Sequence, residues 1–458
     1  MITRRQFTVA LGTLAAAGVT GGLFRHPKAW AEPLATKTTM GYGPLIDDPK
    51  GILSLPKGFT YDVLSSFGEL MNDGNRVPDR ADGMGCIALD DEHVALVRNH
   101  ELQPKHVAEF GPGQPSPLKT PKAYDSNDKG EALPGGTSTI VVNTKTGKKV
   151  KEYLSLTGTI RNCSGGITPW GSWLTCEESV DKPSSTNSQY HGYVFEVAGN
   201  AEGMVEPKPI KALGRFNHEA VCVDPDTGIV YLTEDRGDSL LYRLVPNEYG
   251  NLHAGGQLQA LAVKGYPKFD TRNWQKQEMP VSSWVDCEWV DIENPDSAED
   301  DLRKQGYQSG AALFARGEGV HWGQGEFYFC CTNGGNKKLG QVMRYQPSPY
   351  EGTPSEHDQP GRLQLFVESS DAQVFNFGDN LTVAPNGHLI VCEDQYTAVV
   401  DNHLRGITPD GEVYPFAQLA VQTELAGACF SPDGSTLFVN VYSPAQTLAI
   451  RGPWKHLS

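Results

Sequence analysis

The stretch from Asn162 to Ser179, which reads NCSGGITPWGSWLTCEES, begins with a thiol and ends with two carboxylates. Between them lie a Pro-Trp-Gly turn and a short apolar run, a pattern that predicts a β-hairpin turning near Trp170. Because a hairpin returns its end beside its start, we expect Cys163 and Glu178 to be neighbours at one end of a sheet. A thiolate and carboxylates placed in this way can share a metal ion. The local sequence leaves open the alternative that Cys163 is only a small buried residue, as free cysteines commonly are.

Five further segments share the pattern of this hairpin: an acidic residue, an apolar strand, a tight turn, a second apolar strand and polar residues. They begin at Asp82, Glu219, Glu318, Asp379 and Glu424. Their turns include Asn-Gly at 386–387 and Asp-Gly at 433–434, which tolerate positive φ. The repeat predicts an all-β fold, a six-bladed β-propeller with loop and short-helix decorations. The alternative is a set of unrelated hairpins in a β-sandwich.

The repeat also brings polar side chains to equivalent strand ends, which in a propeller surround a central channel. The first polar positions are Asp82, Cys163, Glu219, Glu318, Asp379 and Glu424. The second are Asn99, Glu178, Glu234, Asn333, Glu393 with Asp394, and Asn440. We therefore expect several carboxylates and one thiolate to converge on the channel axis.

Carboxylates that converge without compensation are very unfavourable, so bound cations are the natural way to neutralise them. Oxygen ligands favour Ca²⁺ or Mg²⁺, whereas one thiolate among carboxylates, without a pair of histidines, favours iron over zinc. His100 and His218 occur in two Asn-His-Glu runs. We interpret both as groups that lie behind the ligands.

A pocket charged with metal ions would attract an anionic substrate. Arg316 lies two residues before Glu318, and its planar guanidinium can clamp a phosphate. Asn99 and Arg161 are expected near the mouth of the same pocket. Ordinary hydrogen bonds or surface salt bridges are the alternative roles for these side chains.

The N-terminus resembles an export signal. Thr3-Arg4-Arg5-Gln6-Phe7 precedes an apolar run that reaches Phe24 and is followed by Ala29-Trp30-Ala31. This pattern is typical of a twin-arginine signal with a cleavage site, so residues 1–31 would be recognised by the twin-arginine translocase and removed. A membrane anchor is the alternative, but the run is short and rich in glycine. The mature protein is expected to be periplasmic or secreted, without a stable membrane anchor.

The composition and length of the chain limit its possible binding partners and its domain organisation. The chain has 39 basic and 55 acidic residues, and the signal removes four basic residues, so the mature balance of 35 minus 55 is −20. Nucleic acid is therefore an unsuitable partner. The nine cysteines do not suggest a disulfide framework. Residues 32–458 are expected to form one propeller domain, a monomer, with an extended lead-in over 32–60 and with surface decorations from the spacers 103–136 and 250–306.

The chain resembles the PhoX alkaline phosphatases of bacteria along nearly all of its length. The resemblance is carried by GYGPLIDDPKGILSLPKGFTYDVLS, ADGM, VRNHE, RNCSGG, TCEES, FNHEA, TEDRGD, ARGEG and NLTVAPNGHLIVCED. It implies a six-bladed propeller that holds two Fe³⁺ ions and two or three Ca²⁺ ions, joined by a bridging oxo group. It also implies hydrolysis of phosphate monoesters outside the cytoplasm, which serves phosphate acquisition.

The resemblance also assigns roles to residues. Cys163 is similar to the thiolate ligand of iron, and Glu178, Glu219 and Glu318 to metal-binding glutamates. To these the repeat adds Asp379, Glu393 and Asp235 as metal ligands. Asn99 and Arg316 match the positions that hold the substrate phosphate. The lysine that the family has before the cysteine hairpin is absent from YLSLTGTIRNC, and the family's late tryptophan at the phosphate has no counterpart. Either phosphate binding is altered or Arg161 supplies it, and the difference concerns substrate range and rate more than metal binding.

Two other functions remain possible from the sequence. A calcium-dependent propeller lactonase or esterase would need a ring of carboxylates but no thiolate. A non-catalytic binding propeller would hold its metals for stability alone.

Overall fold

The computed structural model describes residues 41–108, 118–395, 397–398 and 400–454. The predicted export signal, residues 1–31, lies outside the described residues. The described chain is almost entirely β-structure. Its helices are the α-helix α2 (Leu302–Gln308) and the 3-10 helices η1 (Pro104–Ala108), η2 (Lys211–Leu213), η3 (Leu252–Ala254) and η4 (Pro354–Asp358). Among the described residues, no helix combines the length and the apolar character needed to span a bilayer.

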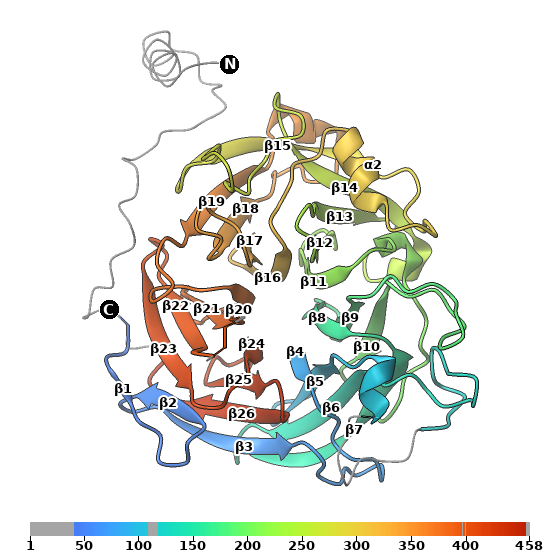
Figure 1. Ribbon diagram of the computed structural model, residues 1–458, viewed down its shortest axis with the longest axis vertical. Helices are drawn as coiled ribbons and strands as arrows, with labels where there is room; N and C mark the ends of the chain where they lie inside the picture. The colour runs from blue at the N-terminus through green and yellow to red at the C-terminus, as the bar shows by residue number, and fades with distance from the viewer. Residues whose placement is uncertain (1–40, 109–117, 396, 399, 455–458) are drawn as a thin grey trace.

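The strands form five antiparallel sheets that surround a central opening (Figure 1). One sheet contains β4 (Ala81–Ala88), β5 (His93–His100), β6 (Gly135–Asn143) and β7 (Lys148–Thr159), and the next contains β8 (Asn162–Ile167), β9 (Ser172–Glu177) and β10 (Val194–Ala198). A nine-stranded sheet contains β11 (His218–Val223), β12 (Val230–Glu234), β13 (Leu241–Pro246), β14 (Gly256–Val263), β15 (Trp284–Asp291), β19 (Arg362–Glu368), β18 (Gln341–Gln346), β17 (Glu326–Cys331) and β16 (Gly317–Gly323). The four-stranded and three-stranded sheets each place one edge strand at the opening, β4 and β8, whereas the nine-stranded sheet places both of its edge strands there, β11 and β16.

Two further sheets complete the ring. One runs in the order β1 (Leu45–Ile46), β2 (Leu53–Pro56), β23 (Val413–Leu419), β22 (His403–Ile407), β21 (Leu389–Glu393) and β20 (Gly378–Val383). The other runs β24 (Leu425–Phe430), β25 (Thr436–Val441), β26 (Gln446–Arg451) and β3 (Thr60–Ser66). Because β3 pairs with β26, a strand from the start of the chain closes the ring against a strand from its end.

The arrangement is that of a propeller. The strands at the opening are β4, β8, β11, β16, β20 and β24, and each packs against the next around the ring (Figure 1). Their apolar residues are buried between neighbouring sheets, as in the cluster that joins Val221 of β11, Leu174 of β9 and Cys163 of β8. The all-β propeller prediction is confirmed in its architecture, and the alternative of a β-sandwich is wrong.

Parts of one predicted surface spacer and of the predicted lead-in belong to the sheets. The spacer 250–306 contains β14 and β15, and β15 pairs with β14 on one side and β19 on the other. The lead-in contributes β2, which pairs with β23. Both segments use their backbone groups to extend sheets, because an exposed sheet edge leaves N–H and C=O groups unpaired.

The inner hairpins share one irregularity, a bulge close to the start of the inner strand. Ala81 pairs with His100 and Met84 with Arg98, so one extra residue stands between the two pairs on the inner strand. The same shift occurs in the hairpins β8–β9, β11–β12, β16–β17, β20–β21 and β24–β25. A bulge re-aims the side chain within it. Here it lies at the end of the strand where the polar residues gather.

Candidate metal centre

The register of the bulges defines three sets of equivalent residues. The inner positions lie within the bulge and are Asp82, Cys163, Glu219, Glu318, Asp379 and Gly427. The return positions directly follow the second strand and are Glu101, Glu178, Asp235, Thr332 and Asp394. The rim positions directly precede the inner strand and are Arg80, Arg161, Asn217, Arg316 and Phe377. Each return position donates its backbone N–H to the carbonyl of the rim position in its own hairpin.

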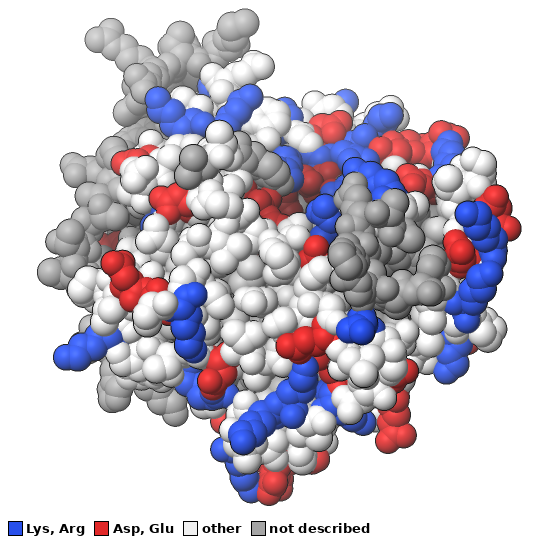
Figure 2. Space-filling view, turned by 60° about the horizontal axis from the view of Figure 1, so that its bottom comes forward, with Lys and Arg blue, Asp and Glu red and all other residues white. Residues whose placement is uncertain are grey.

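Most of these positions, but not Asn217, Thr332, Phe377 and Gly427, line one acidic cavity of about 350 Å³. Its carboxylates are Asp82, Glu101, Glu178, Glu219, Asp235, Glu318, Asp379, Asp394 and Glu424, and its arginines are Arg80, Arg161 and Arg316. The cavity therefore holds nine carboxyl groups against three guanidinium groups. On the face of the molecule in Figure 2, acidic and basic side chains are interspersed, in contrast to this concentration of one sign.

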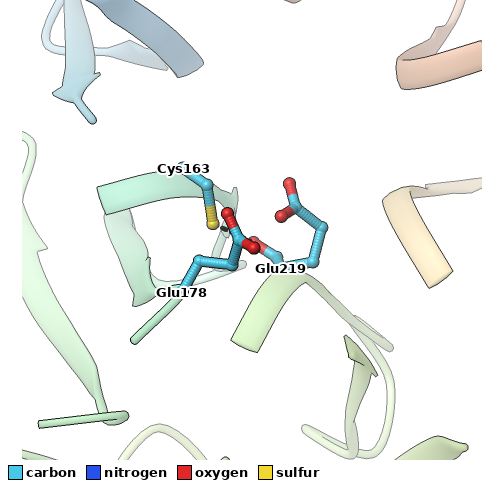
Figure 3. Close-up of side chains that lie close together, drawn as sticks. All are labelled: Cys163, Glu178 and Glu219. Carbon is cyan, nitrogen blue, oxygen red and sulfur yellow. Dashed lines mark hydrogen bonds between the residues drawn. The ribbon is translucent and has the colours of Figure 1, made fainter. Parts of the chain in front are cut away.

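Within the cavity, three groups of side chains are close enough to hold a cation each. The first is Cys163, Glu178 and Glu219, the second is Glu219, Glu318 and Asp379, and the third is Asp379, Asp394 and Glu424. Within each group, the potential ligand atoms all lie within 4.8 Å of one another. Glu219 and Asp379 each belong to two groups, so the three groups form a continuous arc. Figure 3 shows the thiol of Cys163 and the carboxylates of Glu178 and Glu219 pointing toward one another.

The electrostatics of the arc require positive charge. Burial raises the pKa of Glu219 well above its usual value, and the neighbouring carboxylates of Glu318 and Asp379 raise it further. Burial likewise raises the pKa of Asp379 to about 7, with Asp394 adding to the effect. Burial raises the pKa of the Cys163 thiol well above its usual value, and the carboxylates of Glu219 and Glu178 raise it further. Ionised groups packed in this way need bound cations to remain charged, so the residues present fit a metal centre.

The donor types differ along the arc. The first group is the one that contains a thiol, and all three of its members are buried. The third group contains carboxylates alone and is half-buried, so it can admit water. A thiolate suits a transition metal, whereas carboxylates with access to water suit Ca²⁺. This gradient agrees with the sequence argument for a soft ligand at Cys163.

Two arginines reach the cavity from rim positions and are fixed by carboxylates. Arg316 donates from Nε and Nη2 to the two oxygens of Asp235, at 2.7 and 2.8 Å. Arg161 donates to Glu101 at 2.9 Å and to Glu178 at 2.5 Å. Both have left-handed backbone, with φ of 52° and 50°. Such φ values are uncommon for residues with a Cβ and recur at functional sites.

Asn99, predicted to contact substrate, does not line the cavity. It is fully buried, and its Nδ2 donates to the carbonyls of Cys163 at 3.1 Å and Ser164 at 2.7 Å. Its oxygen accepts hydrogen bonds from Trp173 and Thr175. All of its hydrogen-bonding capacity is therefore directed at β8 and β9, where it positions the backbone that carries Cys163.

Glu393, predicted to be a ligand, also lies outside the cavity. One of its oxygens accepts from the backbone N–H of Asn376 and from Arg405, and the other accepts from the N–H of His403. Because successive residues of a strand point to opposite sides, its neighbour Asp394 is the one that enters the cavity. The other predicted ligands, Cys163, Glu178, Glu219, Glu318, Asp379 and Asp235, all line it.

The structure adds residues to which sequence reasoning gave no ligand or substrate role. They are Arg80, Asp82, Glu101, Asp394, Glu424 and Tyr442. Glu424 was aligned with the inner positions, but the bulge places Gly427 there, and Glu424 enters from just before β24. For Glu101, Asp394 and Tyr442 the usable signal was their position directly after a second strand. Asp82 was already among the polar positions that the repeat predicts to converge on the channel. His100 and His218 bond to Ser138 and to the Gly214 carbonyl, behind the cavity.

A second cavity follows along the same inner strands. It has a volume of about 380 Å³ and is lined by residues such as Met84, Cys86, Val221, Cys222 and Trp322. None of the residues that line it is a carboxylate, Lys or Arg. The two cavities thus divide the channel into an acidic part and an apolar part.

Fold and site together define an all-β, propeller-type protein whose channel carries an acidic centre for several cations. The chain belongs to the family described as alkaline phosphatase PhoX, whose model matches residues 40–445. It is accordingly a phosphatase, and metal dependence fits this family.

Comparison with solved structures finds proteins of similar fold. The structure of Pseudomonas fluorescens PhoX in complex with vanadate, a transition state analogue, is similar with a TM-score of 0.66 and 19% identity, over 88% of this chain and 96% of that chain. At this identity the likeness concerns the fold. A gluconolactonase from Xanthomonas campestris, XC5397, matches with a TM-score of 0.37 and 12% identity, over 82% of this chain and 97% of that chain. Comparison with curated proteins gives no match.

Proposed function

We propose that this phosphatase hydrolyses phosphate monoesters outside the cytoplasm, in the cavity formed by the inner, return and rim positions, and releases inorganic phosphate. The observation that carries the proposal is the continuous arc of three ligand groups in a cavity that three arginines also line. Cations in the arc and the guanidinium groups beside it would create a positive site within an otherwise acidic protein. A phosphate dianion is the kind of substrate that such a site attracts.

We assign iron to the first group and calcium to the second and third. The thiol of Cys163 supports iron in the first group, and the all-carboxylate composition supports calcium in the others. The three groups account for one iron and two calcium ions. The resemblance implies two Fe³⁺ and two or three Ca²⁺ ions, so the additional ions would share the carboxylates of the same cavity. When bound, such ions supply Lewis acidity at the phosphoryl oxygens.

The chain's own residues bind and orient the substrate. The guanidinium of Arg316 is held flat by the two oxygens of Asp235, so it can present N–H donors to phosphoryl oxygens without losing further freedom. Arg161, held by Glu101 and Glu178, takes the place of the lysine that the family has near this strand. Donors fixed before the substrate arrives stabilise the charge that develops during phosphoryl transfer. Asn99 keeps the Cys163 segment in place from behind.

Elemental analysis combined with an activity assay tests the proposal. The folded protein should contain iron and calcium, and should hydrolyse p-nitrophenyl phosphate with loss of activity after chelation. Arg316→Lys keeps the charge but not the planar fork, and should lose activity while it retains metal. A protein that binds iron and calcium but hydrolyses no phosphomonoester would contradict the proposal.

Three further properties belong to the same proposal. The sequence of residues 1–31 supports export by the twin-arginine translocase, to the periplasm or the medium. The recurrence of one bulge register in the hairpins supports a count of six blades. The closure of the ring within one chain, through β3 and β26, supports a monomer.

A further inference from the structure

The three rim arginines enter the cavity from different sectors of the ring. Arg80 precedes β4, Arg161 precedes β8 and Arg316 precedes β16. Following the ring from β4 through β8 and β11 to β16, the strands β4 and β16 lie on opposite sides of the opening (Figure 1). All three arginines have left-handed backbone, with φ between 50° and 53°. The same backbone conformation thus brings a guanidinium to the cavity in three hairpins, and those of Arg80 and Arg316 come from opposite sectors of the ring.

The partners of the three arginines differ. Arg161 and Arg316 form close ion pairs with candidate ligands, Arg161 with Glu178 at 2.5 Å and Arg316 with Glu318 at 3.0 Å. Arg80 instead donates from Nη1 to the hydroxyl of Tyr442 at 3.1 Å, and its guanidinium lies 5.5 Å from the centre of that ring. Within the described part of the chain, no ion pair shorter than 4.0 Å joins Arg80 to a carboxylate. The hydrogen-bond partner of the charged guanidinium of Arg80 is therefore the neutral side chain of Tyr442.

Tyr442 fixes this arrangement. Its hydroxyl donates to Glu101, so its oxygen is left to accept the bond from Arg80. Glu101 is in turn bound by Arg161 at 2.9 Å. The half-buried guanidinium of Arg80 is therefore held at the wall of the cavity with donors to spare.

The ligand arc takes no member from the sector of Arg80, although Asp82 and Glu101 of that sector also line the cavity. The three groups draw their members from the hairpins that begin at β8, β11, β16, β20 and β24, and no member comes from β4 or β5. A phosphoryl group bound at the arc therefore lies against those hairpins and near Arg316. The alcohol part of the ester then extends toward the sector of β4 and β5, where Arg80 lies.

We propose that Arg80 is a specificity-determining residue that binds an anionic group, a carboxylate or a second phosphate, on the alcohol part of the substrate. The preferred substrates are then phosphomonoesters whose leaving alcohol carries its own negative charge. Tyr442 acts as a positioning residue for Arg80. This inference rests on the proposed function, because it concerns the same cavity.

A matched pair of aryl phosphates tests the inference. The metal-loaded protein is assayed with 3-carboxyphenyl phosphate and with its neutral analogue, 3-carbamoylphenyl phosphate, and the ratio of the two kcat/KM values is measured. In the native protein we expect the ratio to favour the carboxylate. Arg80→Met should lower this ratio about tenfold or more, the size expected when a charge-assisted hydrogen bond is lost. Arg80→Lys should restore part of the ratio, and the exposed Arg76→Ala should leave it unchanged.

Tyr442→Phe provides a second, independent variant. It removes the hydroxyl that holds Arg80 but keeps the ring, so it should lower the ratio less than Arg80→Met, mainly through a higher KM for the carboxylated ester. Melting temperature and metal content identify any variant that fails to fold. A ratio that stays the same in both Arg80→Met and Tyr442→Phe would overturn the inference. Failure of the native protein to hydrolyse either ester would instead overturn the proposed function.

Discussion

The acidic cavity and the apolar cavity are built from the same six inner strands, yet their chemistry is opposite. On β11, Glu219 belongs to the ligand arc, whereas Val221 and Cys222 line the apolar cavity. On β16 the change from Glu318 to Val320 is equally abrupt. The bulge lies between these residues, and it turns the inner position away from the regular alternation of the strand. Within the inner strands, the candidate ligands are therefore confined to the first residues, and the later residues line the apolar cavity.

Glycines separate the two cavities. A Cβ on Gly319 would lie 2.6 Å from the Cα of Asn380, and a Cβ on Gly427 would lie 2.4 Å from the carbonyl oxygen of Asp82. Neighbouring inner strands therefore approach each other closely just beyond the inner positions. This close contact holds the ligands of adjacent hairpins at the distances that the arc requires.

Two buried thiols give the sharpest test of the comparison. Cys163→Ser removes the soft ligand of the acidic cavity, and we expect iron to be lost and kcat/KM to fall by about 10³-fold, because a Lewis acid contributes several kcal/mol to a reaction of this kind. Cys222→Ser makes the same change in the apolar cavity. It should cost about 1–3 kcal/mol of stability through the buried hydroxyl, while metal content is kept. Equal losses of activity in the two variants would show that the thiol of Cys163 is not a ligand.

Substitutions of the neighbours Glu393 and Asp394 test which of these two acidic residues faces the acidic cavity. Glu393→Gln breaks a buried pair with Arg405, whose Nε lies 2.9 Å from Glu393, and should lower the free energy of unfolding by about 3–5 kcal/mol. Asp394→Asn should instead lower the calcium content and the activity with little effect on the metal-free protein. Denaturant unfolding and elemental analysis of both variants distinguish the two roles. A calcium loss in Glu393→Gln alone would reverse the assignment.

The pH dependence of stability should come partly from a site outside the metal centre. His191 lies between Glu177 at 2.6 Å and Asp125 at 3.2 Å. Burial lowers the pKa of His191, but the two carboxylates outweigh this effect and raise the pKa to about 9. Because the folded-state pKa is the higher one, the stabilisation, about 3 kcal/mol, is complete below pH ~6.5 and is lost as the pH rises through about 9.

Urea unfolding between pH 6 and pH 10 measures this contribution. The native protein should lose more stability over this range than His191→Gln does. Parallel pH profiles for the two proteins would show that His191 is not protonated in the folded state.

Substitution of a glycine at a close contact between inner strands should have the smallest effect on stability. Gly319→Ala forces a Cβ against Asn380 and should cost about 1–3 kcal/mol through overpacking. It should also weaken metal binding, because Glu318 is its neighbour. Gly203→Ala is the control, since a Cβ there meets no atom within 4 Å. Melting temperatures of the two variants give the comparison, and equal values would argue against close strand contact at Gly319.

The sequence was sufficient for the propeller architecture and for most of the ligand arc, because the repeat in hydrophobicity and turn residues is strong. It was ambiguous wherever two acidic residues are adjacent. In Glu177-Glu178, Glu234-Asp235 and Glu393-Asp394, one residue faces the cavity and the other faces the sheet interior. A shift of one residue exchanges them, and composition does not reveal which register the bulge selects. Asn99 was misplaced for the same reason, since its position relative to the strand end decides where its amide points.

The pairing of β3 with β26 has a consequence for the order of assembly. The contact between Arg80 and Tyr442 joins residues 362 positions apart, so the cavity wall is incomplete until the last part of the chain has been synthesised. Such non-local contacts slow folding. The first sector of the ring is therefore completed only when the last one has been synthesised, and the position of Arg80 depends on the closure of the ring.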